Sequence, residues 1–257
     1  IALHNYVENR SNDYYKFMAT TRFAEKAIRI TEGLIAEAMT KAERKDPIYI
    51  AFDEYNVWYR AKGEEGNEEV YNLEDALVVS TFLNIFVRNA HVVKMANMAQ
   101  LVNVIAPIMA EEHGPAWRQT TFYPFAEAAL HARGQAYAPA ISSPTIHTEA
   151  YGDVPAIDAV VTWDEQARTG LLLAVNRDAN TPHTLTIDLS GLPGLPGLGT
   201  LALGKAQLLH EDDPYRTNTA EAPEAVTPQP LDIAMNATGT CTATLPAISW
   251  ISVEFHG

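Results

Sequence analysis

The sequence predicts an α/β segment followed by an all-β domain, and two observations support this. From residue 1 to about 137, short apolar runs of strand length alternate with longer helical stretches, an order that indicates a parallel sheet. From about residue 138 the helical stretches stop, and short strand-like runs separated by Gly and Pro are typical of a β-sandwich. We therefore expect two domains, 1–137 and 138–257.

The α/β segment contains three strand and three helix candidates. In chain order these are a strand at 2–4, a helix at about 13–43, a strand at 48–52, a helix at about 72–89, a strand at 99–106 and a helix at about 124–132. Ile48–Phe52 is a continuous apolar run, which suits a parallel strand covered on both faces. Asn72 and Asp75 have the spacing of a capping box and predict a helix start.

The strands of the all-β domain are expected at 159–163, 171–175 and 184–189, with a long turn at Gly191–Gly197. A complete (β/α)₈ barrel takes about 250 residues, whereas the α/β segment has room for three βα units. It is therefore either a small open sheet or the C-terminal part of a larger barrel. The first residues, which start without Met, read as the end of a buried strand, so we expect residues upstream of Ile1.

The composition limits the possible partners. The chain has 257 residues and a formal net charge of −14, which would repel both nucleic acid and an anionic membrane surface. No apolar run approaches the roughly 18 residues that a membrane span needs. Cys241 is the single cysteine, so an internal disulfide is impossible. The sequence shows no His, Cys and Asp grouping with metal-ligand spacing, and we expect no metal. These features fit a neutral ligand.

Polar residues gather where the expected strands end. His4 and Tyr6 end the first strand, Glu54 and Trp58 follow the second, and Gln100 lies within the third. In barrels the carboxyl ends of parallel strands form the active-site face. We therefore expect these five side chains to lie near one another.

This set of residues indicates cleavage of a glycosidic bond. A retaining glycosidase uses two carboxyl groups, one as nucleophile and one as acid/base. Glu54 would be the nucleophile, with Tyr or His donors keeping it ionised and Trp58 offering a flat apolar face to a sugar. Each residue also has a structural alternative: Glu54 in a solvated loop, His4 as a hydrogen-bonding residue, Trp58 in the core and Gln100 in the barrel wall.

Five longer segments carry a resemblance to a known family. They are Phe52–Tyr59, Tyr71–Val79, Met95–Met109, Ala116–Phe125 and Leu245–Trp250. Together they resemble the C-terminal half of the α-L-arabinofuranosidases of glycoside hydrolase family 51. The resemblance implies the last three units of a (β/α)₈ TIM barrel followed by a jelly-roll-like β-sandwich. One departure is Tyr55, which stands where the family usually has Trp.

The resemblance also implies roles for the candidate residues. Glu54 would be the nucleophile at the end of the seventh barrel strand, and His4 and Tyr6 would end the sixth. Trp58 would line the arabinofuranosyl subsite, and Gln100 would reach the site from the eighth strand.

The acid/base glutamate of the family ends the fourth strand in a Gly-Asn-Glu motif. In this chain Gly66-Asn67-Glu68 follows the nucleophile in a loop, so we interpret it as coincidence. The acid/base residue is therefore expected on an N-terminal half, which would be a separate chain or a missing segment.

Further expectations follow from the family. The substrates would be arabinan or arabinoxylan oligosaccharides, no cofactor would be needed, and the protein would be a cytoplasmic homo-oligomer. Two alternatives remain open at this point. One is another glycosidase of the same clan, such as an endoglucanase, and the other is a non-catalytic fragment or carbohydrate-binding subunit.

Overall fold

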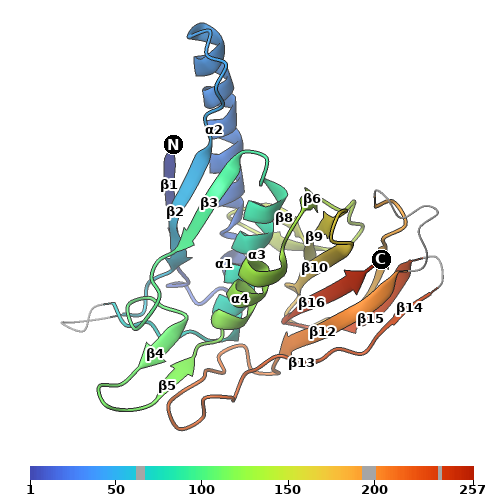
Figure 1. Cartoon of the computed structure of the whole chain (residues 1–257). Coiled ribbons are helices and arrows are strands. Elements are labelled where there is room, and N and C mark those ends of the chain that lie inside the picture. Colours follow the sequence, from blue (N-terminus) through green and yellow to red (C-terminus); the bar gives the residue numbers. More distant parts are fainter. Residues whose placement is uncertain (62–66, 193–200, 237–238) are drawn as a thin grey trace.

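The structure, a computed structural model, describes residues 1–61, 67–192, 201–236 and 239–257. Figure 1 shows a small sheet and a strand-rich part on opposite sides of two helices, α3 and α4. The first part of the chain consists of β1 (Ala2–Val7), α1 (Tyr14–Ala19), α2 (Arg22–Lys41), β2 (Ile50–Val57), α3 (Leu73–Arg88), β3 (Val93–Met98), β4 (Ile108–Ala110), β5 (Ala116–Arg118) and α4 (Phe122–His131). None of the described helices is both long and apolar enough to cross a membrane.

The small sheet is parallel and has the strand order β1-β2-β3. Helices connect its strands, so the expected alternation of strands and helices is confirmed. The capping box at the start of α3 is also confirmed, because the Asn72 side chain accepts from the Asp75 N–H at 3.1 Å and Asp75 accepts from the Asn72 N–H at 2.9 Å. This reciprocal pair fixes where α3 begins, directly after the loop that leaves β2.

The third strand is displaced from its expected position. The prediction of a strand at 99–106 is wrong, because β3 spans Val93–Met98 and the residues after it form a loop. Within this loop the Gln100 N–H donates to the Ile105 carbonyl at 3.1 Å. The Asn56 amide donates to the carbonyls of Ala99 at 2.7 Å and Ile105 at 2.6 Å. The backbone groups of this loop are thus hydrogen-bonded without forming a strand. The apolar side chains of the segment predict a strand because they carry no information about these contacts.

The helix expected at 13–43 is divided into α1 and α2 at Thr20 and Thr21. The Thr20 hydroxyl donates back to the Phe17 carbonyl at 2.7 Å, a bond that competes with the helical ladder. Beyond this break α2 extends past the edge of the sheet (Figure 1). The helix expected at 124–132 starts two residues earlier, at Phe122.

The second part is a β-sandwich, as the sequence predicted. Its strands are β6 (Gln135–Tyr137), β7 (Thr145–Thr148), β8 (Gly152–Pro155), β9 (Ile157–Asp164), β10 (Thr169–Asn176), β11 (His183–Asp188), β12 (Ala202–His210), β13 (Gln229–Pro230), β14 (Ile233–Met235), β15 (Thr240–Leu245) and β16 (Ser249–His256). A six-stranded antiparallel sheet, β13-β12-β16-β10-β9-β6, faces a three-stranded sheet, β11-β15-β14. The turn predicted at 191–197 lies outside the described residues from residue 193 onward. Strand β6 precedes residue 138 and already pairs with β9, and the division of the chain after residue 137 stays a prediction.

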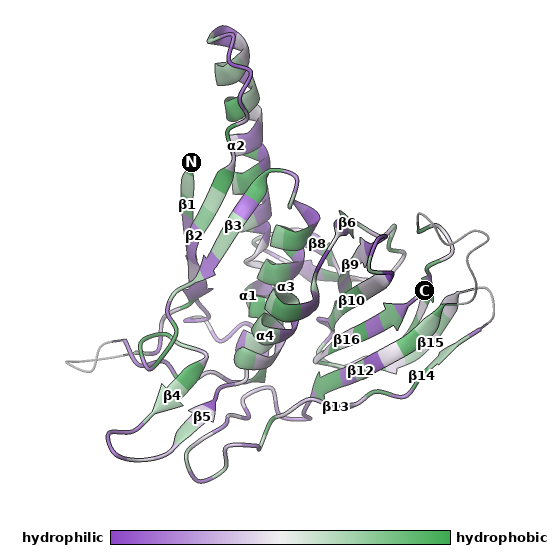
Figure 2. Ribbon diagram, in the orientation of Figure 1, coloured by the Kyte–Doolittle hydropathy of each residue, from purple (hydrophilic) through white to green (hydrophobic). Residues whose placement is uncertain are grey.

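The central strands of the six-stranded sheet, β9, β10 and β16, are buried on both faces. Along β9, Val160 belongs to the core that contains α3, whereas Val161 belongs to the core between the two sheets. Residues Leu73–Phe86 of α3 are all buried, and Figure 2 shows this helix as mainly hydrophobic. Because α3 contacts β2 as well as β9 and β10, the parallel sheet and the sandwich share one apolar core.

A buried ion pair joins α3 to the sandwich. Arg88 binds Asp158 on β9 through two contacts of 3.0 and 3.1 Å, and the Asn84 amide donates to the same carboxylate at 2.7 Å. Burial acts to raise the pKa of the Asp158 carboxyl, but the positive charges of Arg88 and Arg177 and the hydrogen bonds from Arg88 and Asn84 outweigh burial. The pKa therefore lies below its usual value. The helix is therefore held to the sheet by polar contacts as well as by packing.

Candidate active site

The first two parallel strands bring the predicted residues together. In the register of β1 and β2, Leu3 pairs with Phe52 and His4 pairs with Glu54, so Asp53 is an extra residue on β2. Such a bulge changes the direction in which a strand presents its side chains, and bulges are common beside active sites. The bulge aligns Glu54 with His4, as the sequence predicted.

Glu54 has two polar neighbours on β1. The Tyr6 hydroxyl donates to Glu54 Oε2 at 2.9 Å. His4 Nδ1 lies 3.4 Å from the same oxygen, and His4 Nε2 lies 2.9 Å from Asp53 Oδ1. The imidazole therefore lies between two carboxylates. The Glu54 side chain remains 46% exposed, so a ligand can reach it.

Tyr6 is a reliable donor to this carboxylate. Burial, the hydrogen bond to Glu54 and the negative charge of Glu54 together raise the pKa of its phenol to about 12. At neutral pH the hydroxyl therefore keeps its proton. Tyr6 is therefore always able to donate its hydrogen bond to the Glu54 carboxylate.

Trp58 lies beside this pair. Its ring meets the Tyr6 ring edge to face, with 5.4 Å between the centroids, and its side chain is 42% exposed. An exposed indole next to a carboxylate provides the flat apolar surface against which the carbon face of a sugar can pack. The structure therefore brings together His4, Tyr6, Glu54 and Trp58.

The segment that follows Trp58 is held by a buried carboxylate that the sequence analysis missed. Glu69 Oε1 accepts the backbone N–H groups of three successive residues: Tyr59 at 2.5 Å, Arg60 at 2.6 Å and Ala61 at 3.2 Å. Glu69 is fully buried. Three hydrogen bonds to one carboxylate restrict the backbone directly after Trp58, and so restrict where the indole can lie.

Arg60 gives this segment a second attachment, to the start of α3. Its guanidinium binds both carboxylate oxygens of Asp75, at 2.9 and 3.2 Å, and contacts Glu74 at 3.3 Å. Burial raises the pKa of Asp75 to about 7, and Arg60 opposes that shift. The sequence analysis interpreted Asp75 only as part of a helix cap. No sequence pattern indicates Arg60, because the fold of the loop determines which carboxylates it contacts.

Gln100 and Tyr55 lie outside this cluster of His4, Tyr6, Glu54 and Trp58. Gln100 is exposed in the loop after β3, its side chain makes no hydrogen bond within the described part of the chain, and its role stays a prediction. Tyr55 is fully buried and packs against Phe82 and Phe86 of α3, on the opposite side of β2 from Glu54. The departure at Tyr55 therefore changes the core and leaves the exposed cluster as it is. Gly66 of the Gly-Asn-Glu motif lies outside the described residues.

The geometry defines a class of protein. An accessible carboxylate in the C-terminal half of strand β2, with a hydroxyl donor and an exposed indole beside it, matches one half of a retaining glycosidase site. The chain belongs to the α-L-arabinofuranosidase C-terminal domain family, whose model matches residues 53–249.

Individual relatives agree with this assignment. The chain is 68% identical to an intracellular exo-α-(1→5)-L-arabinofuranosidase of Bifidobacterium longum, over 94% of this chain and 47% of that protein. It is 36% identical to an exo-α-(1→6)-L-arabinofuranosidase of the same species, over 95% of this chain and 49% of that protein. A solved structure of a family 51 α-L-arabinofuranosidase from B. longum matches with a TM-score of 0.90 and 63% identity, over 100% of this chain and 52% of that one.

These comparisons confirm the resemblance to family 51 and its expected fold. The chain spans about half the length of the curated relatives that it matches. The matched half is the C-terminal one, with the last barrel units and the sandwich.

Proposed function

We propose that this chain is the nucleophile-bearing half of a retaining, exo-acting α-L-arabinofuranosidase. The observation that carries the proposal is the Glu54 carboxylate, which lies in the C-terminal half of β2, is about half exposed and accepts a hydrogen bond from Tyr6 on the neighbouring parallel strand. The names of the relatives support the choice of sugar, because both act on α-L-arabinofuranosides.

In the proposed mechanism Glu54 attacks the anomeric carbon while the bond to the leaving oxygen breaks. A second carboxyl group, about 5–5.5 Å away, gives its proton to that oxygen and then takes a proton from water, which releases the sugar from Glu54. This acid/base residue would come from the half of the relatives' length that the chain does not span. Tyr6 holds the Glu54 carboxylate in one orientation, and Trp58 packs against the sugar.

The substrates would be arabinan or arabinoxylan oligosaccharides with terminal arabinofuranosyl groups. The two B. longum relatives cleave different linkages, (1→5) and (1→6). The higher identity to the first favours the (1→5) linkage. We further propose that the enzyme works inside the cell and forms a homo-oligomer, and that Gln100 reaches the sugar once the barrel is complete.

The test is a Glu54→Ala variant of the complete enzyme, assayed on p-nitrophenyl α-L-arabinofuranoside. We expect loss of nearly all turnover, partial recovery with azide, and an arabinosyl azide of inverted configuration, because azide replaces the carboxylate in a single displacement. Glu112→Ala, which changes a 92% exposed loop carboxylate, serves as the matched control and should keep full activity. Normal turnover by Glu54→Ala would remove Glu54 from the mechanism.

A panel of other nitrophenyl glycosides tests the sugar. Faster hydrolysis of a glucoside or cellobioside than of the arabinofuranoside would indicate an endoglucanase-like enzyme. No hydrolysis of any glycoside by the complete protein would indicate a binding role.

A further inference from the structure

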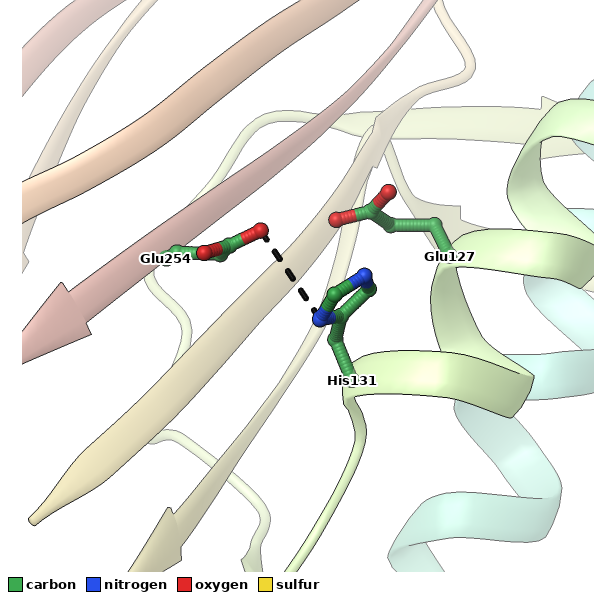
Figure 3. A group of neighbouring side chains, drawn as sticks. All are labelled: Glu127, His131 and Glu254. Atoms are coloured by element: carbon green, nitrogen blue, oxygen red, sulfur yellow. Dashed lines mark ion pairs between the residues drawn. The ribbon is translucent and has the colours of Figure 1, made fainter. Parts of the chain in front are cut away.

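A second group of ionisable side chains lies between α4 and the sandwich. Glu127 and His131 stand four residues apart on α4 and so occupy one face of the helix. Glu254 reaches toward them from β16, and Figure 3 shows the three side chains converging on one space. One ligand atom from each lies within 4.8 Å of the other two, and His131 Nδ1 is 3.8 Å from Glu254 Oε1.

Glu127 shows that this space lacks a positive partner. Glu127 is only 7% exposed, and the Gln207 amide donates to Glu127 Oε2 at 3.0 Å. Its Oε1 has no hydrogen-bond partner in the part of the chain that the structure describes. Leaving a buried carboxylate oxygen unpaired is costly, because water no longer solvates it.

Among the residues that the structure describes, no side chain forms an ion pair with Glu127. Lys205 and Arg118 line the same cavity as Glu127, but neither makes an ion pair among the described residues. His131 offers one imidazole to two carboxylates, and its side chain is 44% exposed, so it can turn toward either. The group therefore holds more negative charge than its protein partners balance.

We propose that Glu127, His131 and Glu254 bind a divalent metal ion of the zinc class. One imidazole nitrogen and two carboxylate oxygens are ligands that such an ion accepts, at about 2.0–2.2 Å. Neighbouring ligands of a tetrahedral ion then lie about 3.3 Å apart. The separations, 3.8 Å between His131 and Glu254 and at most 4.8 Å among all three ligand atoms, would close by movement of the long side chains, and water would take the fourth position.

Gln207 completes the arrangement. Carboxylates that bind metals are themselves usually held by a hydrogen bond from a neighbouring group. Gln207 on β12 holds the outer oxygen of Glu127 in this way, which leaves Oε1 for the ion. The ion would link helix α4 to strand β16 of the six-stranded sheet, and its role would be structural. The sequence analysis expected no metal because Glu254 lies far along the chain from α4.

The test is calorimetric titration of the intact, EDTA-treated protein with Zn²⁺. We expect one saturable site that Ca²⁺ does not fill, because an imidazole suits zinc and a calcium ion prefers oxygen ligands. His131→Gln and Glu254→Gln should each weaken Zn²⁺ binding at least tenfold. Both changes are close to isosteric, and thermal unfolding without metal checks that each variant folds.

His91→Gln is the matched control. His91 pairs with a single exposed carboxylate, Glu32, at 2.9 Å, and its loss should leave the Zn²⁺ affinity unchanged. In the wild-type protein, saturating Zn²⁺ should also raise the Tm by roughly 5 °C, and the two site variants should lose that rise. Absence of saturable binding, or equal affinity in wild type and His131→Gln, would overturn the proposal.

Discussion

Replacing Tyr6 with Phe removes a single hydroxyl from the proposed site. That hydroxyl donates to Glu54 Oε2 at 2.9 Å, and the aromatic ring that meets Trp58 stays in place. A hydrogen bond to a charged group contributes about 1.5–3 kcal/mol. Without it, the half-exposed carboxylate regains rotational freedom, and the fraction of enzyme with Glu54 aimed at the anomeric carbon falls.

At about 1.4 kcal/mol per factor of ten, this loss corresponds to a 10- to 100-fold decrease in kcat/KM. Because Glu54 is 46% exposed and water replaces part of the bond, we expect a value near the lower limit. The assay is steady-state hydrolysis of p-nitrophenyl α-L-arabinofuranoside by the complete enzyme. We expect the change mainly in kcat, since the ring that lies beside the sugar is unchanged.

Tyr49→Phe is the control. Tyr49 precedes β2 at the opposite end of the strand from Glu54, and its ring is stacked by Lys94. This variant should behave as wild type. A Tyr6→Phe enzyme with kcat/KM within twofold of wild type would refute the orienting role, and a rise in KM alone would assign the hydroxyl to sugar binding.

Three further outcomes are expected. Glu69→Ala should lower the free energy of unfolding in urea by roughly 3–5 kcal/mol, because three backbone donors lose a buried carboxylate, and Glu69→Gln should cost less than half of that. In a ¹³C NMR titration the pKa of Tyr6 should fall from about 12 toward 10 in Glu54→Gln, but stay above 10 because burial is the largest cause. Arg88→Met should cost roughly 3–5 kcal/mol at neutral pH, because buried Asp158 loses its main counter-charge. Because folding lowers the pKa of Asp158, its ionised carboxylate stabilises the fold at pH values above 3.8, and this contribution is lost at lower pH. The difference in unfolding free energy between wild type and Arg88→Met should therefore shrink as the pH falls below 3.8.

Each of these outcomes has a result that would contradict it. Equal destabilisation by Ala and Gln at position 69 would show that the acceptor oxygen is unimportant. A Tyr6 pKa unaffected by Glu54→Gln would show that the two groups do not interact in solution. A difference for Arg88→Met that is constant from neutral pH to pH 3 would show that the charge of Asp158 is not the cause.

The parts of the fold that the sequence predicted well are those with a local cause. The Asn72–Asp75 capping box acts within a few residues, and α3 begins where it indicates. The apolar run Ile48–Phe52 indicates only the first part of β2, which spans Ile50–Val57 and so includes Glu54. The loop after β3 is different. Its apolar residues imitate a strand, but the amide of Asn56, on another strand, takes two of its carbonyl groups. A contact between elements decides the structure there, and single-residue patterns do not record it.

The candidate site divides in the same way. His4, Tyr6 and Glu54 could be predicted because parallel strands run side by side in the same direction, and the structure pairs His4 with Glu54 and hydrogen-bonds Tyr6 to it. Glu69 could not, since its partners are backbone groups of a loop whose path depends on the whole fold. The group around His131 escaped for a related reason, because one of its members lies on the last strand of the sandwich.

Helix α3 also determines how this protein can change during evolution. The helix is buried from Leu73 to Phe86, and it packs against β2 of the parallel sheet as well as against β9 and β10. Arg88 and Asn84 of this helix donate hydrogen bonds to a carboxylate of the sandwich. A sandwich of this kind cannot be exchanged between enzymes as an independent module, because a donor sequence would have to match the helix residue by residue. The two parts are therefore expected to be inherited together, and sugar specificity to diversify in the exposed loops at the strand ends.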